Sequence, residues 1–93
     1  MRYSRARDVA WVTEGEPRTV YVSVMPSGRP LVLKGTAADI WLGVLELGER
    51  DLVVDDLAAA YAVDAALIEP QVDDFLAELV RSGLLAAEPV KEL

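Results

Sequence analysis

The side chains that could do chemistry in this sequence are mainly carboxylates, because its 93 residues contain no histidine and no cysteine. Without these two residue types the chain has no ordinary general base, thiol nucleophile or zinc site. The adjacent pairs Asp55-Asp56 and Asp73-Asp74 could serve as acid and base or hold a metal ion. Neighbouring residues on a helix point about 100° apart, so neither pair converges on one atom. We interpret both pairs as solvated helix faces and expect neither catalysis nor a cofactor.

Glycine and tryptophan offer no clear ligand site either. The six glycines are scattered among turns and helix ends, without the spacing of a phosphate-binding loop. Trp11 and Trp41 could stack on a ligand, but both have apolar neighbours in the sequence. We therefore expect both rings to pack in the core.

The charge balance separates the classes of possible partner. Sixteen acidic residues stand against nine basic ones, giving a formal net charge of −7 and a pI near 4.4. Nucleic-acid binding relies on clustered Lys and Arg, and the one cluster here is Arg2, Arg5 and Arg7. The balance predicts no nucleic-acid partner and favours a neutral or basic peptide.

Length and hydropathy indicate one small domain spanning residues 1–93. Apolar residues make up 53% of the chain, without an uninterrupted stretch near the ~20 that a membrane helix needs. Residues 1–7 lack the apolar run of a secretory signal and are expected to be flexible, and residues 88–93 are expected to form a polar tail. The lack of cysteine fits a cytoplasmic location, and we expect no membrane partner.

Hydrophobic periodicity changes near Gly35. Before it, residues 8–14, 18–25 and 30–34 are rich in β-branched and aromatic side chains and are separated by Gly- and Pro-containing turns. These runs predict a three-stranded antiparallel meander. The third strand has no later strand to pair with, so its outer edge is expected to be open.

After Gly35 the apolar spacing approaches 3.6 residues, which predicts three helices. The first begins at Thr36, where Asp39 completes a near capping box, and it ends at Gly48. The second covers about residues 54–62.

The third helix ends at Arg81, and Pro70 is expected to break it. A short turn over residues 65–68 would precede a main helix that restarts at the proline. Together these elements predict an α+β, winged helix-turn-helix-like fold, with a three-stranded antiparallel sheet followed by three helices.

A helical wheel of the third helix shows apolar surface on one side of the core stripe centred on Ile68. Leu76 lies about 80° and Val80 about 120° from that centre. We interpret this extension as the floor of a groove whose flanking carboxylates meet a basic residue. The alternative is that both side chains pack on the sheet or on residues 84–85. The predicted groove residues on this helix are Glu69, Val72, Asp73, Leu76 and Val80.

Residues 31–86 resemble the PqqD-like peptide chaperones, also called precursor-peptide recognition elements. The shared features are L-x-L before T-A-A-x-I-W, a glycine closing that helix, D-L-A-x-x-Y, and the ending V-D-D-F-L-A-E-L-V-R-S-G-L-L. Two positions depart from the pattern: Val53 stands where relatives often have a Ser or Thr cap, and Pro70 falls inside the last helix.

The resemblance implies peptide binding. A stand-alone chain of this length is most similar to the B1 proteins of lasso-peptide pathways, which deliver a precursor to a separate, B2-type leader peptidase; a cyclase is a further candidate partner. It also implies that the leader peptide adds as an antiparallel strand along the third strand and packs against the third helix. The strand residues expected to contact it are Pro30, Leu31, Val32, Leu33 and Lys34.

Two other functions are compatible with the residues. A winged helix can bind DNA, although this third helix carries four acidic residues against Arg81 alone. A dimerisation subunit could use the open strand for self-pairing.

Overall fold

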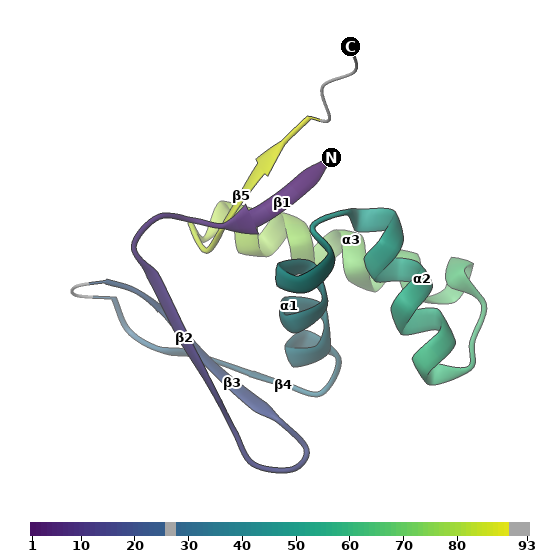
Figure 1. Cartoon of the computed structure of the whole chain (residues 1–93), viewed down its shortest axis with the longest axis horizontal. Helices are drawn as coiled ribbons and strands as arrows, with labels where there is room; N and C mark the ends of the chain where they lie inside the picture. Colours follow the sequence, from purple (N-terminus) through teal and green to yellow (C-terminus); the bar gives the residue numbers. More distant parts are fainter. Residues whose placement is uncertain (26–27, 90–93) are drawn as a thin grey trace.

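The protein is described by a computed structural model that covers residues 1–25 and 28–89 (Figure 1). Within these residues the chain forms, in order, β1 (Arg2–Arg5), β2 (Val9–Glu14), β3 (Thr19–Val24), β4 (Leu31–Lys34), α1 (Thr36–Leu47), α2 (Arg50–Tyr61), α3 (Ala65–Arg81) and β5 (Leu85–Glu88).

The predicted meander is confirmed by the sheet β2-β3-β4, in which both neighbouring pairs are antiparallel. In its register, Val22 lies opposite Trp11 of β2 and Leu31 of β4. The sheet lies on one side of α1 and α2 on the other, while α3 runs past α1 from α2 towards β5 (Figure 1). The α+β, winged helix-turn-helix-like prediction is therefore correct.

The core lies between the sheet and the helices, and Trp41 of α1 is fully buried in it. Half-buried Trp11 packs edge-to-face on Trp41, with ring centroids 6.4 Å apart. The prediction that both rings are packing residues is confirmed. No helix in the described ranges is long and apolar enough to cross a membrane.

The expectation of a flexible N-terminus is wrong for residues 2–5. They form β1, which pairs antiparallel with β5 from Arg2↔Glu88 to Arg5↔Leu85. The amide of Tyr3 also donates to the carbonyl of Gly48, at 2.7 Å. Glu88, the first residue of the predicted polar tail, thus ends a strand, and residues 90–93 lie outside the described ranges.

The first helix keeps its expected ends but not its expected cap. Gly35 is the N-cap residue, and no side chain caps the helix. Asp39 instead accepts a hydrogen bond from the Tyr61 hydroxyl. Gly48 ends the helix with φ 75°, the left-handed conformation that glycine adopts at little cost. The second helix starts at Arg50, four residues earlier than predicted, so the predicted range of 54–62 was too short at its start.

The break expected at Pro70 is absent, because α3 is one helix from Ala65 to Arg81. The proline removes one helical hydrogen bond, the one that an amide at position 70 would donate to the carbonyl of Ala66. Ile68 and Val72 on either side are buried, at 5% and 0% exposure. Anchoring on both sides of the proline holds the helix together.

Candidate functional site

The direction of the backbone groups of β3 decides what β4 presents to solvent. Beyond the end of the β2-β3 ladder, the amide of Met25 donates to the carbonyl of Asp8, at 2.6 Å. Hydrogen-bonded and non-hydrogen-bonded pairs alternate along an antiparallel ladder. Because Met25 and Asp8 form a hydrogen-bonded pair, every second residue before Met25 in β3 also bonds to β2. The backbone groups of the residues between them, Val22 and Val20, therefore point away from β2 and towards β4.

Two residues of β4 direct both their N–H and their C=O groups to the outer edge of the sheet. Leu31 and Leu33 lie opposite Val22 and Val20, so their amides and carbonyls bond to β3. The N–H and C=O of Val32 and Lys34 point the other way, and β4 has no second neighbour among the described strands. The expected open edge is therefore present, and such an edge can accept an added strand.

The five predicted strand residues differ in accessibility. Leu33 is 3% exposed and belongs to the core, so its side chain cannot meet a peptide as expected. Leu31 and Val32 are 43% and 47% exposed, and Pro30 and Lys34 are also exposed. Leu33 anchors the strand, while the other side chains remain accessible.

A pocket of about 310 Å³ opens next to the C-terminal end of β4. Thr36 lines the pocket and follows Lys34, the last residue of β4, by two positions, which places the pocket at this end of the strand. Leu67 is the most exposed of the large apolar side chains lining it, at 68%. The lining residues are Thr36, Tyr61, Val63, Leu67, Ile68 and Gln71.

Tyr61 connects two helices at this pocket through its hydrogen bond to Asp39 of α1. Burial and then the carboxylate of Asp39 raise the pKa of the phenol above its ordinary value. The ring therefore stays neutral at physiological pH and presents an apolar face with a fixed hydroxyl. The Tyr61 side chain is 40% exposed, so part of it is accessible from solvent.

The predicted floor on α3 is wrong for two of its three residues. Val72 and Leu76 are 0% and 1% exposed and form part of the core. Val80 keeps 37% exposure. Most of the apolar surface beyond the core stripe is therefore packing surface, because Leu76 lies in the core and Arg50 of α2 contacts the same flank.

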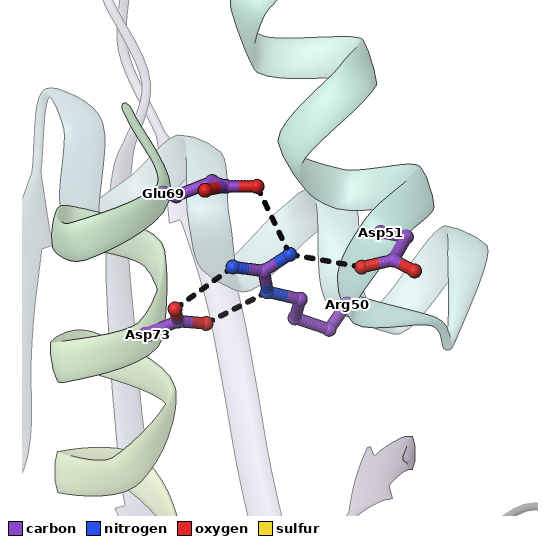
Figure 2. Close-up of polar contacts among 4 residues, drawn as sticks. All are labelled: Arg50, Asp51, Glu69 and Asp73. Atoms are coloured by element: carbon purple, nitrogen blue, oxygen red, sulfur yellow. Dashed lines mark hydrogen bonds and ion pairs between the residues drawn. The ribbon is translucent and has the colours of Figure 1, made fainter. Parts of the chain in front are cut away.

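Glu69 and Asp73, the acidic residues predicted to flank the groove, are already paired within the protein. Both face Arg50 at the start of α2 (Figure 2). The guanidinium of Arg50 donates twice to Asp73, both at 2.8 Å, and once to Glu69 at 3.4 Å. A further hydrogen bond to Asp51, at 2.9 Å, completes the cluster. Arg50 lowers the pKa of Asp73, and its carboxylate partners raise the pKa of Arg50. These carboxylates join α2 to α3, and neither lines the pocket beside β4.

The accessible flank of α3 is the opposite one, where Leu67 and Gln71 line the pocket. Sequence reasoning missed these two residues together with Tyr61 and Val63. One available signal was Leu67, a large apolar side chain about 100° from the core stripe on the flank that was assigned to polar residues.

The geometry therefore defines a small winged helix-turn-helix-like protein with an open edge strand beside a partly apolar pocket. The family model described as coenzyme PQQ synthesis protein D (PqqD) matches residues 17–85. The chain belongs to the PqqD family, which confirms the resemblance seen in residues 31–86.

One solved structure with the same fold is TbiB1 in complex with the TbiA(beta) leader peptide. The two structures superpose with a TM-score of 0.81 at 23% sequence identity, over 94% of this chain and 99% of that chain. No curated protein matches the sequence.

Proposed function

We propose that this chain binds the leader region of a ribosomally synthesised precursor peptide by strand addition to β4. The observation that carries the proposal is the open edge at Val32 and Lys34, with an apolar pocket at its end. Membership of the PqqD family supports it, as does the leader peptide bound to TbiB1.

The direction of pairing relates the peptide to the pocket. A strand antiparallel to β4 has its N-terminal end beside the C-terminal end of β4, where Thr36 and Leu67 line the pocket. An apolar side chain near the start of the paired segment fits there. Backbone pairing tolerates many sequences, so the pocket supplies the selectivity.

The proposal extends to a separate leader peptidase of the B2 type, to which the chain delivers the bound precursor in lasso-peptide biosynthesis, with a cyclase as a further partner. The chain itself performs no catalytic step in this scheme, consistent with a sequence that lacks His and Cys. The lack of cysteine also favours a cytoplasmic setting.

Fluorescence anisotropy with leader peptides encoded beside this chain tests the proposal. Val32→Pro removes an outward amide without removing a bond to β3, and we expect it to weaken binding by about tenfold or more. Thr13→Pro, at an outward position on the opposite edge strand β2, is the matched control and should change the Kd by less than about twofold. No leader binding tighter than ~100 μM, or equal losses in both variants, would reject the proposal.

The pocket is tested separately by Leu67→Glu, since this side chain is 68% exposed and can be replaced without disturbing the core. We expect weaker leader binding with an unchanged thermal midpoint. Leu76→Glu is unsuitable as a binding variant, because it would place a charge at a fully buried position and unfold the protein.

A further inference from the structure

The sheet has a second outer strand, β2, whose exposed edge the proposed leader binding does not use. Counted from the hydrogen bond between Met25 and Asp8, every second residue of β2 directs its backbone groups to β3. These residues are Ala10, Val12 and Glu14. The backbone groups of the intervening residues, Val9, Trp11 and Thr13, point to the open side.

The outward groups of Val9 already have partners. Its amide donates to the carbonyl of Ala6, at 3.4 Å, and its carbonyl accepts a hydrogen bond from the guanidinium of Arg5. Within residues 1–25 and 28–89, no such partner is present for the outward groups of Trp11 and Thr13. The open ladder on this edge is therefore two outward residues long, with Val12 between them.

We propose that β2 pairs with β2 of a second copy of this chain, antiparallel and about a twofold axis at Val12. In this register Trp11 lies opposite Thr13 of the second copy and Thr13 opposite its Trp11. The two residues with free outward groups then satisfy each other, and each hydrogen-bonded pair contributes two bonds.

The side chains agree with this register. Val12 is 62% exposed, and it meets its own symmetry mate as a non-hydrogen-bonded pair, the closest arrangement in an antiparallel sheet. Residues 9–14 contain no lysine or proline, which commonly protect edge strands from pairing.

Charge also favours antiparallel self-pairing at the ends of the strand. With Val12 on the axis, Val9 lies opposite Gly15 of the second copy. Arg5, which is bonded to the carbonyl of Val9, therefore lies near Glu14 and Glu16 of the second copy. Two such attractions form, one at each end of the paired strands.

The resulting dimer has one continuous sheet in the order β4-β3-β2-β2-β3-β4. Both β4 strands are at its outer edges, so each copy keeps the edge assigned to the leader peptide. Self-pairing through β2 and peptide binding through β4 are thus independent and can be tested separately.

Analytical ultracentrifugation of the full chain tests the dimer. The interface is small, so we expect the mean mass to rise from 10.1 kDa towards twice that value between about 10 μM and 1 mM. Val12→Lys places like charges opposite each other on the axis and should keep the chain folded and monomeric. Val32→Lys, on the same sheet face but on β4, is the control and should still dimerise. A wild-type chain that stays monomeric at ~1 mM, or a Val12→Lys dimer of unchanged strength, would overturn the proposal.

Disulfide trapping tests the register, because the natural chain has no cysteine. Opposed residues in a non-hydrogen-bonded pair have Cα atoms about 4.5 Å apart, within disulfide range. Val12→Cys should form a linked dimer under mild oxidation at least about tenfold faster than the control Val32→Cys. Equal rates would show that cross-linking arises from random collisions or from β4, and would rule out the β2 register.

Discussion

At the scale of single residues, Arg50 pairs with Glu69 and Asp73, the two carboxylates that the sequence suggested as part of the binding surface. Its side chain is 26% exposed and bonds bidentately to Asp73, which is 51% exposed. Bidentate Arg–carboxylate pairs are the strongest of the surface ion pairs, but solvent screening still limits their contribution. The cluster in Figure 2 therefore orients α2 against α3 and adds modest stability.

Asp73→Asn should lower the free energy of unfolding by about 0.5–1 kcal/mol at pH 7. Arg50 depresses the pKa of Asp73 in the folded protein below its ordinary value of 3.8. This contribution to stability is therefore fully present above pH 3.8 and is lost as the pH falls through the lower, folded-state pKa. Urea unfolding at pH 7 and pH 2 should show a smaller difference in stability between wild type and variant at the lower pH.

Asp74→Asn is the control for this experiment, because Asp74 is exposed and has no ion pair within the described part of the chain. Its stability should match that of the wild type at both pH values. Both variants should bind leader peptide normally, since neither residue lines the pocket. A loss of leader binding in Asp73→Asn alone would show that the leader does contact the acidic flank of α3.

At the scale of elements, α3 contains a proline as its sixth residue and remains continuous. Local propensity predicts a break, at a cost of about 3 kcal/mol for an interior proline. Tertiary packing outweighs this cost, because Ile68, Val72, Leu76 and Leu79 are all buried against the rest of the fold. A helix anchored along most of its length keeps its geometry through one missing hydrogen bond.

Pro70→Ala should stabilise the protein by about 1–2 kcal/mol, since it restores a donor for the carbonyl of Ala66. Part of the gain is offset by the greater freedom of the unfolded chain. Chemical denaturation measures the change, and leader affinity should stay constant. An unchanged or lower stability would mean that Ala66 already has an adequate partner and that the proline is not strained.

At the scale of the whole molecule, β1 and β5 join the two ends of the described chain. Tyr3 is half-buried against the core and lies opposite Ala87, and its amide reaches Gly48 between α1 and α2. The N-terminal strand thus links the end of α3 to the loop between the first two helices.

Tyr3→Ala should lower the free energy of unfolding by about 1–2 kcal/mol through lost apolar burial. Ser4→Ala, at the exposed neighbouring position of the same strand, should change it by less than about 0.5 kcal/mol. Thermal or urea unfolding compares the two variants. If both are neutral, the strand contributes little to global stability and frays independently of the core.

Several features of this protein follow from local sequence alone. Alternating apolar residues at Val20 and Val22 define a strand, and the 3.6-residue spacing after Gly35 defines helices, because these periods are properties of the backbone. The open edge of β4 follows from its place as the last strand of a meander. The motifs of residues 31–86, taken together in their order and spacing, were enough to indicate the PqqD family.

Tertiary structure decided which surfaces remain available. The wheel of α3 correctly placed Leu76 beside the core stripe, but a wheel does not show that this side chain is buried or that Arg50 of α2 contacts the same flank. The partners of residues 2–5 lie eighty or more positions away in β5, beyond the reach of any local pattern. Burial and long-range pairing depend on how elements meet in space. Local sequence therefore determined the meander and the three helices, whereas tertiary packing decided the β1-β5 pair and the accessible site.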